Sequence, residues 1–446
     1  MLKYLPIIFL QSYLILTLIL FQFGVVDYNI PNPAFFWSFI ISYHVAWLCG
    51  FLIGIKNGLF KVTHFVSSPA ENYRLFNKSF YIFILTLSFL ASIISFKGAD
   101  SLFSLINPLF WFDSAIQGIT NPGLVYDNKM DRVISGEGGN KVLNVFLFCI
   151  AFSKYLLVTM IVFYWSCIGF KLRFISLLVS ILPALASMSH GTNKGVFDVL
   201  FLFSFSIVFI LIANKYRFGV YNILRYKFFI TIILAALASS ILFFKLTMSH
   251  RGGDIRLIET VDRLNYIQVA VSQSDLIDSS VLYTFSWLST YVTQGYYGFA
   301  IALTQDFDTT FGIGNSVFLT RNVESALGID LRSRTFQYKI DPWWGETSQW
   351  HSFYSYFAND FHFVGVTFVC FLLAFYLARV WIIFLNENNL FACSLLSVFA
   401  IMILYIPANN QIFGFLDGLS AFLFLSILMF LSRKKVRVGR FLIRVS

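Results

Sequence analysis

The stretch L-P-I-I-F-L-Q-S-Y-L-I-L-T-L-I-L-F-Q-F-G-V, residues 5–25, contains no charged side chain. A helix of about 20 apolar residues is long enough to cross the hydrocarbon core of a bilayer. One lysine precedes the stretch, and no small-residue cleavage site follows it. We therefore interpret residues 5–25 as a retained membrane span and not as a signal peptide.

Similar apolar runs recur along the whole chain. Of its 446 residues, 58% are hydrophobic and 12% are charged, whereas soluble domains carry about 25% charged residues. The clearest runs lie at 5–25, 34–54, 79–97, 142–167, 172–188, 196–213, 227–247, 363–385, 390–406 and 413–431. The sequence therefore predicts an all-α polytopic membrane protein with about ten transmembrane helices, forming a single membrane-embedded domain over residues 1–446.

Positive charge is distributed unevenly among the connections between these runs. The loops at 55–78 and 214–227 and the C-terminal tail are rich in Lys and Arg, whereas the alternate short loops contain a single lysine. Cytoplasmic loops carry an excess of Lys and Arg, so we expect both termini in the cytoplasm. The basic inner loops also account for the net charge of +10, and no nucleic-acid partner is predicted.

Two long connections, 98–141 and 248–362, then face the opposite side. Within the second, residues 281–304 form an uncharged run that is rich in aromatic residues. A single extra crossing would place basic loops on both sides of the membrane, so we expect a re-entrant or interfacial helix. Two extra crossings would keep the parity and raise the number of helices to twelve.

Several ionisable residues lie inside the apolar runs, where a charged side chain is costly in a bilayer. His44 and Lys154 lie deep in apolar sequence, and Asp198 and Asp417 lie near outer helix ends. We interpret His44, Asp198 and Asp417 as paired structural groups; for Lys154 the alternative is a misplaced helix boundary. The five cysteines all fall in apolar runs without metal-ligand spacing, so no metal or cofactor is expected.

Two glycine-containing clusters near outer helix ends are candidate anion sites. S-H-R-G-G-D at 249–254 contains Arg251, whose planar guanidinium suits phosphate oxygens. S-H-G-T-N-K-G-V-F-D at 189–198 contains Lys194 beside glycines, which favours an anion nest at a helix N-terminus. The alternatives are an interface anchor for Arg251 and a simple helix cap around Lys194.

The densest polar cluster is D-P-W-W-G-E-T-S-Q-W-H-S-F-Y-S-Y-F-A-N-D-F-H-F-V-G at 341–365. A helix that begins here would place His351 in its first turn and His362 three turns later, about 16 Å along the axis. His351 with Glu346 would be able to take a proton from a sugar hydroxyl, as displacement at an anomeric carbon requires. The alternative is that both groups only satisfy capping donors.

Arginines and aromatic rings accompany this cluster in the same outward loop. Arg321 and Arg334 add two guanidinium groups, and Trp344 belongs to a set of rings that would form a platform for sugar faces. The alternative for the rings is a membrane-interface belt.

In its layout and in these three clusters, the chain resembles the Wzy-type oligosaccharide repeat-unit polymerases, which build O-antigen and related bacterial surface polysaccharides. Outer loops of that family carry an Arg, ten residues and then a Gly. Here Arg334 is followed by T-F-Q-Y-K-I-D-P-W-W and Gly345.

The related O-antigen ligases carry a second motif: a His, then Asn, Ser or Gln, nine residues, Gly, two residues, and Gly, Thr or Tyr. His351, Ser352 and Gly365 match its ends, but His362 replaces the first glycine. This departure argues against a ligase.

The resemblance implies a multi-pass membrane glycosyltransferase of the C type in the bacterial inner membrane. Such an enzyme moves a growing glycan from undecaprenyl diphosphate onto a lipid-linked repeat unit at the periplasmic face, and residues 248–362 would be its large periplasmic loop. The candidate catalytic residues are His351 and Glu346, and the candidate substrate-binding residues are Arg334, Arg251, Lys194, Arg321 and Trp344. Arg and Lys would stabilise the departing diphosphate without a metal.

The implied partners are undecaprenyl-diphosphate-linked oligosaccharides and the lipid bilayer, and a chain-length regulator is left open. One alternative is an O-antigen ligase, whose acceptor is a lipid A core. Another is a polysaccharide transporter or flippase. A transporter should hold its charges inside the helix bundle, whereas most of the charges here lie in one outer loop.

Overall fold

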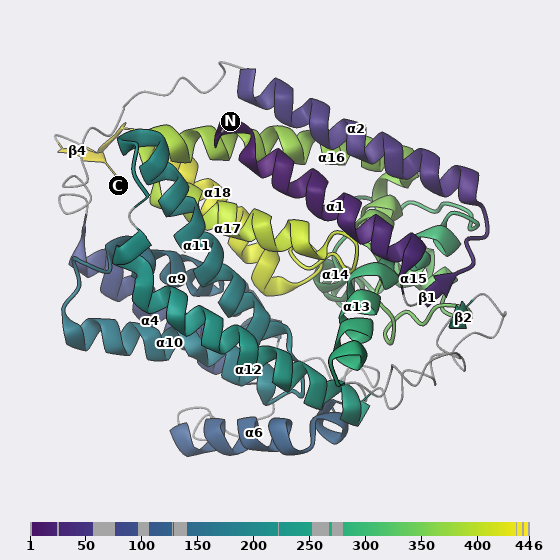
Figure 1. Cartoon of the computed structure of the whole chain (residues 1–446), viewed down its shortest axis with the longest axis horizontal. Helices are drawn as coiled ribbons and strands as arrows, with labels where there is room; N and C mark the ends of the chain where they lie inside the picture. Colours follow the sequence, from purple (N-terminus) through teal and green to yellow (C-terminus); the bar gives the residue numbers. More distant parts are fainter. Residues whose placement is uncertain are drawn as a thin grey trace. The chain divides into compact units, whose positions relative to one another are not determined.

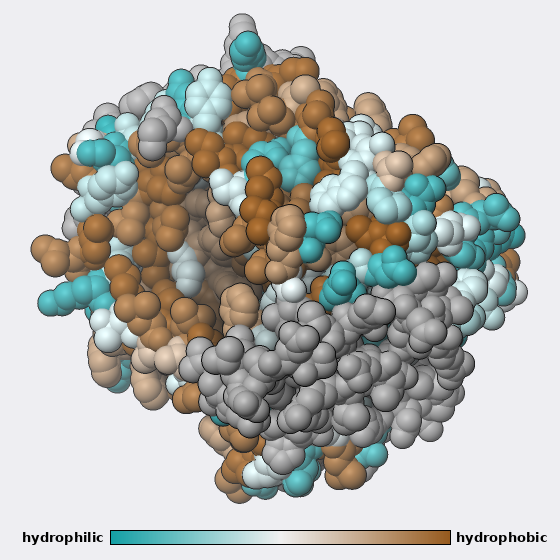
Figure 2. All heavy atoms as spheres, turned by 45° about the vertical axis from the view of Figure 1, so that its right-hand side comes forward, coloured by the Kyte–Doolittle hydropathy of each residue, from teal (hydrophilic) through white to brown (hydrophobic). Residues whose placement is uncertain are grey.

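The computed structural model describes residues 2–24, 26–56, 76–96, 107–126, 128, 141–221, 223–251, 267–269, 280–433, 435–438 and 441–444. Within these residues, nine helices are long and apolar enough to cross a membrane, and the shorter helix α17 (Leu390–Tyr405) is apolar as well. Apolar side chains cover much of the face shown in Figure 2. The prediction of an all-α polytopic membrane protein is confirmed.

The chain divides into two compact units, which are described separately. Unit 1 comprises residues 1–60, 252–381 and 401–415. Its elements are η1 (Leu2–Tyr4), α1 (Leu5–Phe23), β1 (Val26–Tyr28), α2 (Pro33–Lys56), β2 (Ile267–Val269), α13 (Ser280–Ala302), α14 (Val317–Leu327), η6 (Arg332–Arg334), α15 (Phe336–Lys339) and most of α16 (Phe353–Glu387) (Figure 1).

Helix α13 forms the centre of unit 1, where it packs against α1 and α2. The Thr17 hydroxyl of α1 lies 3.1 Å from the Tyr296 hydroxyl of α13, and β1 pairs antiparallel with β2 in the register Val26 to Val269. Helix α13 corresponds to the run predicted at 281–304. Its placement as a re-entrant or interfacial helix stays a prediction.

Unit 2 comprises residues 61–251, 382–400 and 416–446. Its elements are α4 (Lys78–Ser95), α6 (Pro108–Thr120), α8 (Lys141–Ile150), α9 (Phe152–Tyr164), α10 (Phe170–Met188), α11 (Lys194–Phe218), η2 (Ile223–Tyr226), α12 (Lys227–Arg251), α18 (Leu416–Arg433), β3 (Lys435–Val438) and β4 (Phe441–Arg444). Helix α9 is its core, because every residue of α9 is buried among α4, α10, α11 and α18.

The observed helices refine several predicted boundaries. The run predicted at 142–167 is divided into α8 and α9, and the run at 363–385 belongs to the longer helix α16. The connection at 98–141 contains α6, which the sequence analysis did not predict. The Asn107 side chain caps α6 by accepting a hydrogen bond from the Leu109 amide, as Asn commonly does at this position.

Candidate functional site

Residues 303–352 of unit 1 fold into a compact cap that connects α13 to α16. Its short helices are defined by local capping: Ser316 accepts from the Leu319 amide to begin α14, and Thr335 accepts from the Tyr338 amide to begin α15. Gly328 ends α14 at φ 67°, a conformation that glycine adopts without strain. The cap contains most of the residues that the sequence analysis selected.

One carboxylate of α16 holds the first loop of the cap. The Asp360 side chain accepts hydrogen bonds from the backbone amides of Gly312, Gly314 and Asn315, each at 2.9 Å, and from the Asn315 side chain at 2.7 Å. Charge-assisted bonds of this kind are among the stronger ones in proteins. Asp360 therefore fixes the loop 309–315 against the first part of α16.

Helix α16 is interrupted at His362, two residues after Asp360. His362 has φ 57° and ψ 163°, the one non-helical residue in α16. That backbone region is essentially restricted to glycine and costs other residues about 1–3 kcal/mol. The half-buried imidazole packs edge-on against Phe307 of the cap, with ring centroids 5.3 Å apart. The sequence predicts a continuous helix through His362, and this prediction is wrong.

Arg334 and Arg321 are the two cap arginines whose guanidinium groups form no hydrogen bond to the described residues. Both side chains are exposed. The Arg334 guanidinium lies over the Phe311 ring, 5.5 Å from its centroid. Phe311 belongs to the loop that Asp360 holds, so Arg334 lies over that loop, and its exposed guanidinium keeps its donors available to solvent.

The other two basic residues of the cap are paired with carboxylates. Arg332 forms a forked contact with Glu346, with Nε 2.9 Å from Oε1 and Nη2 2.7 Å from Oε2, and this bond raises the pKa of Arg332. Lys339 lies 2.7 Å from Asp308, and its hydrogen bond lowers the pKa of that carboxyl. Glu346 thus contacts Arg332, and no hydrogen bond or ion pair joins it to His351 among the described residues.

His351 precedes the first turn of α16 and is completely buried. Its Nε2 lies 3.3 Å from the Gly345 carbonyl oxygen, so Nε2 carries the proton that is donated. Nδ1 is buried without a partner among the described residues. Burial lowers the pKa of His351 to about 4. The imidazole is therefore neutral and shut off from an incoming hydroxyl in this structure.

Trp344 is also an internal residue of the cap. Its indole Nε1 donates to the Trp350 carbonyl oxygen at 3.0 Å, and its ring packs edge-on against Tyr297 of α13, at 5.0 Å between centroids. Only 3% of its surface is exposed. In this state Trp344 supports the cap and presents no open face to a sugar.

The two remaining candidates belong to unit 2. The Lys194 ammonium lies 3.6 Å from the Asp198 carboxylate, one turn further along α11, and the preceding loop turns at Gly191 with φ 63°. Arg251 is the last residue of α12, and its side chain lies outside the described part of the structure, as do residues 252–254. The structure therefore does not test the anion site predicted at 249–254.

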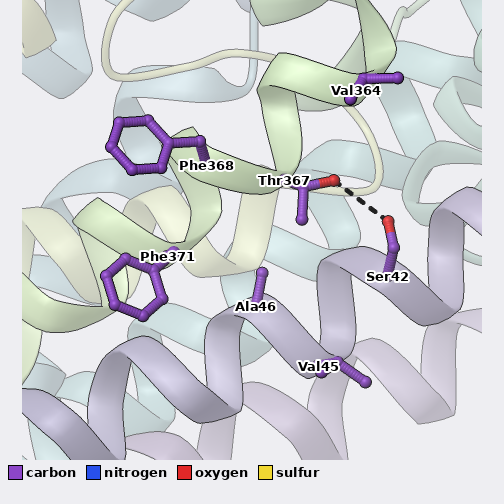
Figure 3. A pocket seen from close by; sticks show the side chains of 7 residues that line it. All are labelled: Ser42, Val45, Ala46, Val364, Thr367, Phe368 and Phe371. Carbon is purple, nitrogen blue, oxygen red and sulfur yellow. Dashed lines mark hydrogen bonds between the residues drawn. The ribbon is translucent and has the colours of Figure 1, made fainter.

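An apolar groove lies between α2 and α16 in unit 1 (Figure 3). The two backbones meet closely at Gly50 and Gly54, where an added Cβ would lie 2.1 Å from the Phe371 carbonyl oxygen and 2.7 Å from that of Phe375. Such small-residue contacts are typical of packed membrane helices. The groove is lined by Ser42, Val45, Ala46, Val364, Thr367, Phe368 and Phe371 and measures about 600 Å³.

The groove is almost entirely hydrocarbon, because its two hydroxyl groups bond to each other. Ser42 and Thr367 lie 3.2 Å apart through their side-chain oxygens. Val364 lies two residues after the interruption at His362, whereas Asp360, which holds the cap loop, lies two residues before it. The sequence signal for this arrangement was G-F-L-I-G at 50–54, which the sequence analysis did not use.

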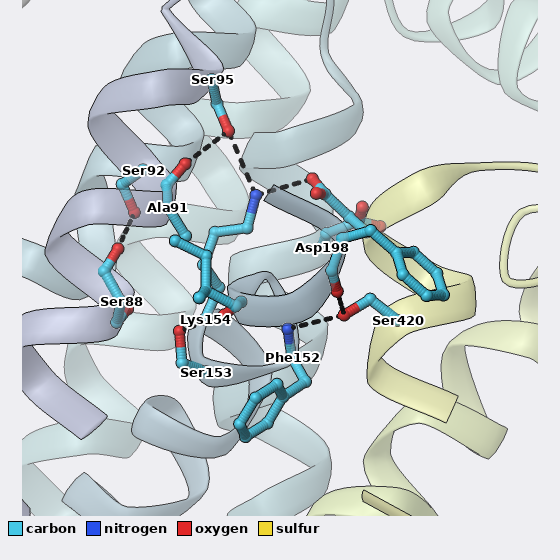
Figure 4. Close-up of polar contacts among 12 residues, drawn as sticks. Ser88, Ala91, Ser92, Ser95, Phe152, Ser153, Lys154, Asp198 and Ser420 are labelled. Carbon is cyan, nitrogen blue, oxygen red and sulfur yellow. Dashed lines mark hydrogen bonds and ion pairs between the residues drawn. The ribbon is translucent and has the colours of Figure 1, made fainter. Parts of the chain in front are cut away.

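A charged pair lies inside unit 2. Lys154 is 6% exposed and lies in the first turn of the buried helix α9. Its ammonium lies 3.2 Å from the Ser95 hydroxyl (Figure 4) and 2.7 Å from the Asp417 carboxylate. Asp417, which the sequence indicates to be a paired group, has Lys154 as its partner. A helix boundary does lie close to Lys154, because α9 begins at Phe152, and Lys154 is buried all the same.

Among the described residues, no group of three His, Cys, Asp or Glu side chains is arranged to hold a metal ion. Comparisons with known proteins returned no matching family model, no matching curated protein and no matching solved structure. The functional proposal therefore rests on the chemistry of the chain itself.

Proposed function

We propose that this protein is a membrane glycosyltransferase that polymerises lipid-linked repeat units of a bacterial surface polysaccharide of the O-antigen type. The observation that carries the proposal is that α16 contributes to two surfaces, one just before its interruption at His362 and one just after it. On one side, the exposed Arg334 guanidinium lies over the loop that Asp360 holds. On the other, the apolar groove begins at Val364.

This arrangement suits a substrate with an anionic head and a long hydrocarbon tail. Guanidinium groups bind phosphate oxygens through paired, directional hydrogen bonds, and an exposed arginine without a carboxylate partner keeps those donors available. The groove between α2 and α16 offers a hydrocarbon surface to an isoprenoid chain. A lipid diphosphate carrying a glycan combines both features, and Arg321 supplies a further exposed cation on the cap.

Within the proposal, Glu346 is the group that accepts the proton of the acceptor hydroxyl. Its carboxylate is 17% exposed and is oriented by the fork of Arg332. The buried His351 acts as a positioning residue, because its Nε2 holds the carbonyl of Gly345, the residue before Glu346. Removing the proton strengthens the hydroxyl as a nucleophile at the anomeric carbon, while arginine stabilises the departing diphosphate.

The first experiment is the surface glycan profile of a deletion strain, complemented with variants. A polymerase predicts a single repeat unit on an otherwise complete core. Arg334→Ala should reduce chain extension by about a hundredfold, with Arg334→Lys in between, because lysine keeps the charge and loses the fork. Lys215→Ala, which removes a basic side chain from the end of α11, is the control. Wild-type glycan length in Arg334→Ala would refute the assignment.

The Lys154–Asp417 pair in the helix bundle of unit 2 favours a second candidate, a polysaccharide transporter, because intramembrane charges commonly mark transport pathways. The same strain separates the functions. Loss of all repeat units from the core, with unextended units retained in the cytoplasm, indicates transport. Loss of repeat units with lipid-linked polymer accumulating indicates a ligase.

A further inference from the structure

A group of ionisable side chains lies around one end of the helix bundle of unit 2, apart from the cap. Lys154 comes from α9, Asp417 from the first turn of α18, and Lys194 and Asp198 from the first two turns of α11. Asp198 lies within electrostatic reach of both Asp417 and Lys154. Three helices thus bring two carboxylates and two ammonium groups together. Figure 4 shows Lys154 and Asp198 of this group.

The two carboxylates differ in how well they are satisfied. Asp417 accepts from the Lys154 ammonium at 2.7 Å and remains 33% exposed. Asp198 reaches Lys194 only at 3.6 Å through Oδ2, and its Oδ1 is buried without a hydrogen-bond donor among the described residues. A buried carboxylate oxygen that lacks a donor is costly when ionised, and the cost falls when the group takes up a proton.

Among the described residues, the charged groups that act on Asp198 are Lys194, Asp417 and Lys154. From α4, the group that contacts this site is the uncharged Ser95. Its hydroxyl accepts a hydrogen bond from Lys154, and its carbonyl oxygen lies 3.2 Å from the His190 ring. From α12, the Thr247 hydroxyl donates to the Asn193 side chain, and Lys245 lies two residues earlier on that helix. The Lys154 ammonium is already paired with the Asp417 carboxylate.

We propose that Asp198, Asp417 and Lys154 form a proton-binding site inside the membrane-spanning bundle of unit 2, with Asp198 as the group that binds the proton. A proton from water adds to the Asp198 carboxylate and gives a neutral carboxylic acid. Lys194, which is 38% exposed, marks the side from which water reaches the site. Uptake changes the summed charge of Lys154, Lys194, Asp198 and Asp417 from zero to +1, and the Lys194–Asp198 attraction is lost.

Lys154 determines which carboxylate takes the proton. Its ammonium stabilises ionised Asp417 at 2.7 Å, so the proton goes to Asp198 while the pair is intact. When the pair separates, Asp417 becomes the competing acceptor. Ionisable groups arranged in this way across neighbouring membrane helices are the usual components of proton relays. The site lies in unit 2 and does not rest on the glycosyltransferase proposal.

The test is infrared difference spectroscopy of the purified full-length protein in lipid nanodiscs, in H₂O and in D₂O. A protonated carboxylic acid has a C=O stretch that an ionised carboxylate lacks. At neutral pH the wild type should show this band with a D₂O shift, and Asp198→Asn should lose it. Asp308→Asn, which removes a carboxylate that is 62% exposed on the cap, is the control and should keep the band.

A second variant tests the role of the lysine. Lys154→Met should increase the band, because Asp417 then also takes up a proton, and Lys154→Arg should leave it as in the wild type. A wild type without the band at neutral pH, or a band that persists in Asp198→Asn, would overturn the proposal and leave a purely structural ion pair. The comparison of wild type with Asp198→Asn stands by itself if Lys154→Met does not fold.

Discussion

His351 was chosen from the sequence as a proton acceptor, and its burial gives it a measurable effect on stability instead. Its pKa is lowered from 6.5 to about 4 by burial, so the unfolded chain binds a proton here at a pH where the folded chain does not. The stabilisation is fully present above pH 6.5 and is lost as the pH falls towards about 4, by about 3 kcal/mol in total. As the pH is lowered across this window, the midpoint temperature of thermal unfolding should therefore fall more steeply for the wild type than for His351→Gln. Equal slopes would contradict a neutral buried imidazole.

The site residues show which contacts a sequence can predict. Glu346 and Arg332 are 14 positions apart in an irregular segment, and nothing in the local pattern indicates that they form a fork. The Lys154–Asp417 pair joins residues 263 positions apart on different helices. Sequence spacing predicts neighbours along one helix, whereas these pairs depend on how separate segments pack.

At the scale of elements, the interruption of α16 reverses an ordinary substitution rule. Within a helix, alanine is more stable than glycine by about 1 kcal/mol. At φ 57° and ψ 163°, however, any Cβ is strained and glycine is not. We expect His362→Gly to be more stable than His362→Ala by about 1–2 kcal/mol. Thermal unfolding of both variants measures this.

Leu372, an exposed position further along α16, provides the matched comparison for that experiment. There Leu372→Ala should be more stable than Leu372→Gly, because the backbone is regular. The same order at both positions would show that His362 is not held in a strained conformation.

The elements also differ in how well the sequence predicts them. Each apolar run became a helix, because a long uncharged segment must satisfy its own backbone hydrogen bonds in a bilayer. The interruption at His362 escaped detection, since neither Gly nor Pro lies there. It is maintained from outside the helix, by the cap loop bonded to Asp360 and the ring of Phe307. Tertiary contacts of this kind leave no periodic signal in the sequence.

At the scale of the whole molecule, the two compact units share continuous helices. Helix α16 begins in unit 1 and ends in unit 2, and α17 begins in unit 2 and ends in unit 1. The exposed guanidinium groups of the proposed transfer site belong to unit 1, whereas the proposed proton-binding site belongs to unit 2. Each proposal can therefore be tested by variants confined to one unit.

The orientation of the chain in the membrane follows from the distribution of basic loops, and α13 is the helix on which it depends. If α13 does not cross, or crosses as one of a pair, both termini lie in the cytoplasm and the cap faces the opposite side. In a cysteine-free background, a membrane-impermeant maleimide applied to intact spheroplasts should then label Asn121→Cys and Leu327→Cys, and spare Val220→Cys until the cells are lysed. All three positions are exposed in the structure. Labelling of Asn121→Cys with protection of Leu327→Cys would mean that α13 crosses once. The cap, with Arg334 and Glu346, would then face the cytoplasm, where it could not act on carriers displayed at the outer face.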